Sequence, residues 1–128
     1  MRIVKNVLVN TQVVALTGLV ATLMLSAAPA SAQSKIPQRE MSYCMATLTG
    51  ATPGARINLR SGPGTNYQQK GYGLVGDRVH ILRESGGTPQ DLAVVENRQG
   101  PSWYRVGFPK SGARGWVRGD FMTPECFN

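Results

Sequence analysis

Residues 57–67 form an alternating segment that runs into a tight turn, with the sequence Ile-Asn-Leu-Arg-Ser-Gly-Pro-Gly-Thr-Asn-Tyr. Ile57 and Leu59 fall on one side of an extended chain and Asn58 and Arg60 on the other, which is the period-2 pattern of a half-buried strand. The Gly-Pro-Gly sequence then ends the strand, because proline fixes φ and the two glycines permit left-handed backbone conformations. Short strands joined by such turns restrict the chain to a small all-β fold.

Further strands are predicted on both sides of this segment, and no stretch after residue 32 has a helical period. In chain order they cover 43–49, 57–60, 78–83, 103–108 and 115–118, with 67–73 crossing between strands and a short helical turn and final strand at 120–122. Residues 85–101 form a long hairpin insertion, in which 91–96 is a candidate for one more strand. The predicted fold is a small closed β-barrel of five to seven short strands.

Four motifs follow one another along the chain: LRSGPGTNY at 59–67, Gly76-Asp77 before a β-branched strand, WYRV at 103–106 and GWVRGDFM at 115–122. In order and spacing they resemble the bacterial SH3-like domain family, also called SH3b or SH3 type 3, over about residues 43–122. The resemblance implies an SH3-like barrel that acts as a binding module. The 85–101 insertion is longer than the turn usual in the family, so we expect it to reshape or cover the binding face.

The first 32 residues have the pattern of a secretory signal peptide. A basic start precedes an apolar stretch at 13–25, and Ala30 and Ala32 supply the small residues before a cut at Gln33. An uncleaved membrane anchor is the alternative, but about 13 apolar residues are fewer than the ~20 needed to span a bilayer. Residues 33–42 are polar and are interpreted as a flexible leader, which places the barrel domain at 43–128.

The charge of the chain indicates what it meets after export. The formal net charge is +7, and loss of Arg2 and Lys5 with the signal peptide would leave +5. A basic exported protein meets anions such as wall polymers, lipid headgroups, lipopolysaccharide or acidic protein faces, although solubility alone accounts for such a charge equally well. Export argues against a nucleic-acid partner.

Cys44 and Cys126 are the two cysteines, and an even number in an exported chain indicates a disulfide. The resemblance implies that the first and last strands pair, which would bring the two Cα atoms within the ~4.4–6.8 Å that a disulfide requires. The alternative is a nucleophilic cysteine, which needs a histidine partner. His80, the single histidine, alternates with Val79 and Ile81 in a strand, so a structural disulfide is predicted.

Alternation also orients the aromatic residues of the later strands. Val106 is the predicted core residue of its strand and shares its side with Tyr104, so Trp103 should point outward or into a groove. Val117 is likewise predicted to be in the core, with Trp116 on the opposite side. For both tryptophans the alternative is packing, because a small domain needs aromatic side chains to seal its core.

The resemblance supplies candidate ligand-binding residues. Trp103 and Phe121 match positions that provide groove aromatics in the wider SH3 class, and such rings give large, rigid contact areas. Arg118 stands where peptide-binding eukaryotic relatives tend to have a proline, which argues against a polyproline ligand and fits an anionic one. The remaining candidates are Tyr67 and Tyr72, for which packing on the barrel is an equal alternative, and Arg60, which could as easily hold the carbonyls of the Gly-Pro-Gly turn as bind a carboxylate.

The family implies recognition of cell-wall peptidoglycan, with aromatic residues covering the peptide and arginines pairing with its carboxylates. The second interpretation is a module for an envelope protein or an anionic surface, with 85–101 setting specificity. No metal or cofactor is expected, because one histidine and a bridged cysteine pair cannot build a metal site. We expect a secreted or periplasmic monomer, without enzymatic activity and without a membrane span once the signal peptide is removed.

Overall fold

The computed structural model describes residues 33–127, so the predicted signal peptide lies outside the described residues. This part of the chain contains eight strands, two 3-10 turns and no α-helix. The strands are β3 (Met41–Leu48), β4 (Arg56–Arg60), β5 (Gln69–Leu74), β6 (Arg78–Leu82), β7 (Val94–Val95), β8 (Trp103–Gly107), β9 (Arg114–Arg118) and β10 (Met122–Cys126). The turns are η2 (Gln38–Glu40) before β3 and η3 (Gly119–Phe121) between β9 and β10. None of the described helices is long and apolar enough to cross a membrane.

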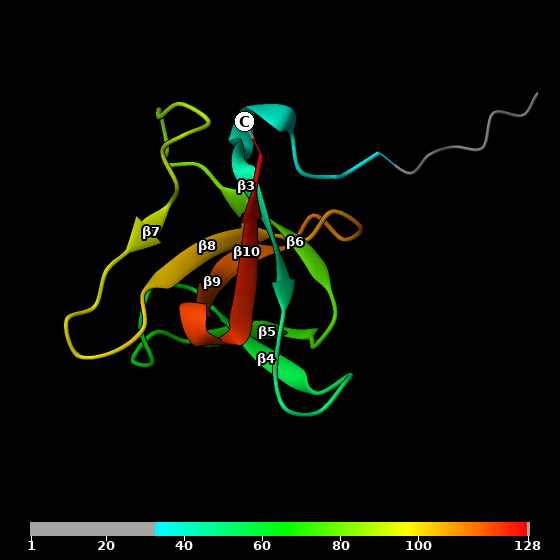
Figure 1. Cartoon of the computed structure of the whole chain (residues 1–128), viewed down its shortest axis with the longest axis vertical. Helices are drawn as coiled ribbons and strands as arrows, with labels where there is room; N and C mark the ends of the chain where they lie inside the picture. Colours follow the sequence, from blue (N-terminus) through cyan, green and yellow to red (C-terminus); the bar gives the residue numbers. More distant parts are fainter. Residues whose placement is uncertain (1–32, 128) are drawn as a thin grey trace, which may run out of the picture. The chain divides into compact units, whose positions relative to one another are not determined.

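The strands form one antiparallel sheet in the order β10-β3-β6-β8-β9-β4-β5, and β7 also pairs with β8. The sheet folds over on itself, so that β3 and β10 cross in front of β8 and β9 (Figure 1). The predicted all-β fold of short strands with a long hairpin insertion is confirmed. Within residues 33–127 no pairing joins β10 to β5, so the sheet is not closed as expected, and it has eight strands where five to seven were expected. The insertion supplies β7, which is the additional strand.

The core lies between the folded-over halves of the sheet and follows from the alternation in each strand. Its centre consists of fully buried side chains: Ala46, Leu48, Val79, Ile81, Val106 and Val117. Ile57 and Leu59 are buried from β4, as their alternation with exposed neighbours predicts. Tyr104 packs against this core from the same side of β8 as Val106.

The contact between β4 and β9 determines where the sheet opens. The two strands share a single register pair, Arg60 with Trp116, whereas β4 pairs with β5 along its length. On the side facing β9, residues 56–58 therefore have no strand partner in the part of the chain that the structure describes. This leaves a gap in the ladder between β4 and the segment that follows β9.

The N-terminal segment expected to be a flexible leader belongs to the folded unit from Ser34 onward. Ile36 is only 1% exposed, and the Lys35 N–H donates to the Pro109 carbonyl at 2.7 Å. The leader prediction failed because Ile36 covers the outer face of the sheet beside Gly107 and Leu82, where a glycine leaves room for it.

The insertion between β6 and β8 has local structure, although its strand is shorter than the 91–96 candidate. Arg83 pairs with Leu92 in an isolated bridge, and β7 then runs beside the first residues of β8. The insertion is also attached to β3, because the Tyr43 N–H donates to the Pro89 carbonyl at 3.0 Å. Residues 85–101 are thus fastened at both ends.

The predicted disulfide is confirmed. Cys44 and Cys126 are register partners across β3 and β10, with their Cα atoms 4.0 Å apart, which is slightly closer than the expected range. Because both thiols are used and no free cysteine occurs in residues 33–127, the nucleophilic-cysteine alternative has no residue to act through.

Candidate functional site

The outer face of β8 and β9 carries a mixed array of tryptophan and arginine side chains. Register pairs Trp103 with Arg118 and Arg105 with Trp116, and Arg60 of β4 lies on the other side of Trp116. This arrangement follows from period-2 alternation in two adjacent strands whose other face is buried. It places large aromatic surfaces and fixed positive charges next to one another.

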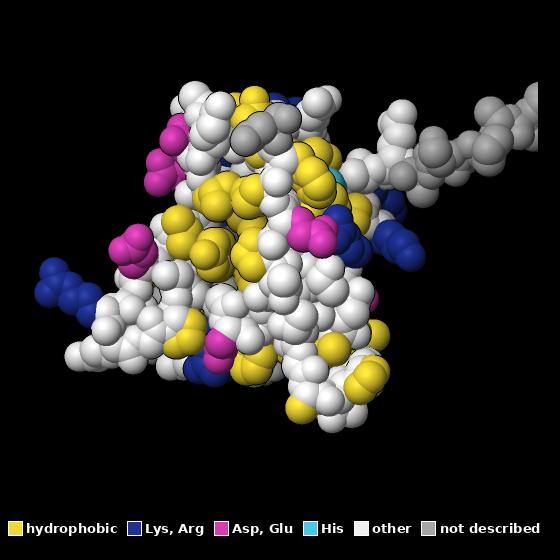
Figure 2. Space-filling view, viewed as in Figure 1, with side chains coloured by type: hydrophobic (Ala, Val, Ile, Leu, Met, Phe, Trp, Pro, Cys, Tyr) yellow, Lys and Arg dark blue, Asp and Glu magenta, His cyan; other side chains and the backbone are white. Residues whose placement is uncertain are grey.

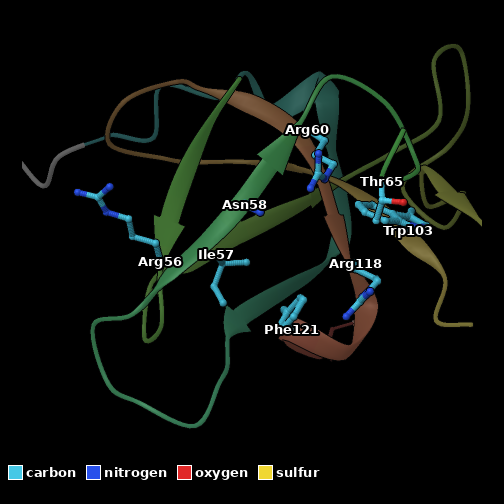
Figure 3. Close-up of a pocket in the computed structure, with 8 residues that line it drawn as sticks. All are labelled: Arg56, Ile57, Asn58, Arg60, Thr65, Trp103, Arg118 and Phe121. Atoms are coloured by element: carbon cyan, nitrogen blue, oxygen red, sulfur yellow. The ribbon is translucent and has the colours of Figure 1, made fainter. Parts of the chain in front are cut away.

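A groove with a volume of about 280 Å³ opens between β4 and the β9–η3 segment, at the gap in the ladder. In Figure 3, the side chains of Trp103, Arg118 and Phe121 surround the same opening, with Ile57 facing it from β4. The complete lining is Arg56, Ile57, Asn58, Arg60, Thr65, Trp103, Arg118 and Phe121. We call this the main groove.

A second hollow, of about 430 Å³, continues the main groove past Trp103. The two share Thr65, Trp103 and Arg118, and the remaining walls of the second come from the Gly-Pro-Gly turn and from residues 95–101. The insertion therefore forms a wall of an extended groove and does not cover it. We call the two hollows together the extended groove.

Trp103 lies at the boundary of the two hollows, together with Thr65 and Arg118. It is only 5% exposed, and Val95 of β7 lies opposite it in register. Trp103 borders the groove, but most of its side chain is packed, as the packing alternative also expected. Trp116 is half-buried on the outer face, away from the core residue Val117.

Arg118 is held in a fixed orientation at the edge of the main groove. Its Nε and Nη2 atoms donate to the two carboxylate oxygens of Asp120 at 2.7 and 3.0 Å, and its guanidinium lies 4.9 Å from the centre of the Phe121 ring. The hydrogen bonds to Asp120 raise the pKa of Arg118, although partial burial opposes them. Asp120 thus balances the charge of Arg118, which lines the groove beside Phe121.

Arg60 supplies the positive charge on the opposite side of the main groove. Its Nη1 donates to the Tyr67 carbonyl at 2.9 Å, which ties β4 to the loop after the Gly-Pro-Gly turn. Among the described residues Arg60 makes no ion pair. Because a guanidinium has five N–H donors, Arg60 can hold this carbonyl and still bind a carboxylate.

Tyr67 and Tyr72 do not line either hollow, in contrast to the other four candidates. Tyr67 is 44% exposed and packs on Gly62, where a β-carbon would lie 2.2 Å from its ring. Tyr72 is 45% exposed and stacks under the guanidinium of Arg56 at 4.2 Å. Figure 3 shows Arg56 directed away from the opening, so this stack lies beside the groove.

Four lining residues were not proposed from the sequence: Arg56, Ile57, Asn58 and Thr65. Ile57 was interpreted as a core residue, which it is, but the gap beside β4 also opens it to the groove. Alternation predicts Asn58 on the outer side of its strand, and this exposed position is the signal that could have identified it as a lining residue. Thr65 follows the Gly-Pro-Gly turn directly, and only the folded loop shows that it faces Trp103.

Residues 33–127 contain no group of three His, Cys, Asp or Glu side chains placed to hold a metal ion. His80 is partly buried on β6, where burial lowers its pKa, and its Nε2 lies 3.1 Å from the Ser34 hydroxyl. This environment is that of a packed imidazole away from the extended groove.

The fold and the groove define a small SH3-like binding domain. The family model of the bacterial SH3 domain matches residues 55–123, and the chain belongs to that family. It is also 32% identical over 74 residues to serine/threonine-protein kinase D of Synechocystis sp., a match that covers 58% of this chain and 12% of the kinase. The chain thus spans a small part of that protein, and the match carries no kinase activity over. No solved structure matches the chain.

Proposed function

We propose that the protein is an exported, non-enzymatic module that binds the peptide part of cell-wall peptidoglycan in the extended groove. The observation that carries this proposal is the continuity of the two hollows past Trp103. A continuous groove suits an extended chain ligand, whereas a single compact pocket suits a small molecule. Membership in a family of binding domains, together with the disulfide, supports an extracytoplasmic role.

The chemistry of the lining fits a short peptide with free carboxylates. Trp103 and Phe121 offer apolar surface to the peptide backbone and its small side chains. Arg60 pairs with a ligand carboxylate, because its charge has no partner among the described residues, and a bidentate arginine–carboxylate pair is the strong geometry. Arg118 acts as a fixed wall, with its charge already balanced by Asp120.

A second candidate is a protein of the cell envelope, for which the insertion would set specificity. Residues 95–101 form one wall of the extended groove, and Val95 is exposed beside them. In Figure 2, apolar side chains gather between the positions of β7 and β10, with acidic side chains near the edges of this patch. An apolar surface with a charged rim is typical of protein interfaces.

The test is retention of the purified, oxidised protein on peptidoglycan sacculi over a range of salt concentrations. Thr65→Trp fills the groove from an exposed loop position, so it blocks the ligand without removing a core side chain. Thr52→Trp, in the exposed 50–55 loop, is the matched control. We expect binding to survive ~0.5 M salt, since simple charge pairing is largely screened there, and we expect Thr65→Trp alone to abolish it.

Sacculi whose peptide stems have been removed by an amidase separate peptide from glycan recognition, and the peptide proposal requires that they retain no protein. Equal retention of both tryptophan variants would contradict the groove as the binding site. If sacculi do not bind but an envelope protein is retained by the wild type and lost in Thr65→Trp, the second candidate is correct.

A further inference from the structure

A second, strongly basic cleft lies at the other end of the outer face and shares no lining residue with the extended groove. Its volume is about 630 Å³, and it is bordered by η2, the end of β6, the loop 85–87, and β8 and β9. Its charged residues are Arg39, Arg83, Arg105, Arg114, Glu40 and Glu84. We call it the arginine cleft.

Only one of the four arginines of the cleft is neutralised. Arg114 forms a two-point pair with Glu40, Nε to Oε1 at 2.7 Å and Nη2 to Oε2 at 3.1 Å, and also donates to the Gly112 carbonyl at 2.9 Å. Within residues 33–127, Arg39, Arg83 and Arg105 make no ion pair. The cleft therefore holds three guanidinium groups against one further acid, Glu84.

The backbone of Arg83 and Arg105 is held by pairing with neighbouring strands. Arg105 stands on the outer face of β8, and Arg83 directly follows β6. The Arg83 N–H donates to the Glu40 carbonyl at 2.9 Å, which fastens η2 to the end of β6. The opposite wall is a turn, closed by the Gly87 N–H to the Glu84 carbonyl at 2.8 Å, in which two glycines carry no side chain into the cleft.

An apolar strip continues directly from the arginine cleft. A neighbouring hollow of about 370 Å³ shares Arg83, Glu84, Ser85 and Arg105 with the cleft, and its other lining residues are Ala93, Val94, Val95 and Trp116. Arg105 and Trp116 are cross-strand partners, so the boundary between charge and apolar surface runs through one register pair. The combined surface is cationic at one end and apolar at the other.

We propose that the arginine cleft binds the phosphate headgroup of an anionic membrane lipid, with Trp116 and the β7 valines entering the lipid interface. Three guanidiniums without partners complement a phosphate, for which arginine has a matching fork geometry. A free phosphate or a soluble polyphosphate would use the arginines but not the apolar strip. Tryptophan beside basic residues is the composition that favours the boundary between headgroups and acyl chains.

The proposal is tested by co-sedimentation of the full oxidised protein with vesicles. The probes are vesicles of phosphatidylcholine with 30% phosphatidylglycerol, vesicles of phosphatidylcholine alone, and inorganic pyrophosphate measured by calorimetry. Each arginine near an anionic membrane surface contributes about fivefold in affinity, so Arg83→Gln/Arg105→Gln should bind the anionic vesicles about 25-fold more weakly. Lys70→Gln/Arg98→Gln removes the same charge from exposed positions outside the cleft and should change binding much less.

Two further variants keep the proposal testable if the arginine double variant does not fold. Glu84→Gln removes the unpaired acid from an exposed position and should tighten vesicle binding. Trp116→Ala should weaken vesicle binding and leave pyrophosphate binding unchanged. Equal losses in the two double variants would assign the affinity to net charge and overturn the proposal, as would no vesicle binding by the wild type. Binding of pyrophosphate without vesicles would overturn the lipid assignment.

Thr65 lines neither the arginine cleft nor its apolar strip, and Val95 is the one residue that borders both the strip and the extended groove, so Thr65→Trp should leave vesicle binding intact. The outcome of this test is thus separable from that of the peptidoglycan proposal.

Discussion

Gly115 of β9 lies so close to Leu59 of β4 that a β-carbon on the glycine would be 2.5 Å from Leu59 Cγ. The same β-carbon would be 3.0 Å from the backbone oxygen of Arg60, which cannot move aside as a side chain can. The strands on the two sides of the main groove therefore approach each other only because position 115 has no side chain.

Gly115→Ala should lower the free energy of unfolding by about 1–3 kcal/mol, as overpacking of a well-packed core does. Gly71→Ala is the matched control, since nothing lies within 4 Å of its β-carbon position, and it should change the free energy by less than ~0.5 kcal/mol. Urea denaturation measures both. Equal stability of the two variants would show that β4 and β9 can separate without cost.

The disulfide should supply a large part of the stability of the domain. It links residues separated by 82 positions, for which the loss of chain entropy in the unfolded state corresponds to about 4 kcal/mol. Cys44→Ser/Cys126→Ser should lower the free energy of unfolding by about this amount, and reduced wild-type protein should behave alike. A double variant as stable as the oxidised protein would contradict this role.

Ile36 should act as a core residue although it precedes the first strand. Its side chain is nearly fully buried against Leu82 and Gly107, and truncation of such a residue to alanine costs about 2–5 kcal/mol. Leu74→Ala, at a position that is 40% exposed, is the control and should cost less than ~1 kcal/mol. If thermal unfolding shows no difference between them, the segment before β3 does not stabilise the barrel.

His80 should make the stability depend on pH in the weakly acidic range. Burial lowers the pKa of His80 below 6.5 in the folded protein, so the unfolded chain takes up a proton first as the pH falls below that value. Stability is therefore complete above pH 6.5 and declines as the pH falls until the folded form is also protonated.

His80→Gln should remove this part of the pH dependence, as measured by denaturation at a series of pH values. The hydrogen bonds from Arg114 lower the pKa of Glu40 below 4.5, so the contribution of Glu40 is lost only at more acidic pH and stays in the variant. An unchanged decline just below pH 6.5 in His80→Gln would show that another group is responsible.

The local elements and the face of each side chain could be predicted from the sequence. Alternation placed Val106 and Val117 in the core and their tryptophan neighbours on the other face, because a half-buried strand has an unambiguous period. The pairing of Cys44 with Cys126 followed from the family resemblance, which brings the first and last strands together. Four of the six proposed site residues also line one groove.

Only the tertiary structure decides the contacts between segments that are distant in the sequence. Three contacts depend on how the sheet folds over, which no local pattern encodes. Ile36 covers Gly107, β4 meets β9 at one register pair, and residues 95–101 line the same hollow as Thr65 and Trp103. The arginine cleft is of the same kind, since Arg39, Arg83, Arg105 and Arg114 come from four separate segments of the chain. A local pattern determines the direction of a side chain, whereas packing of the whole chain determines what that side chain meets.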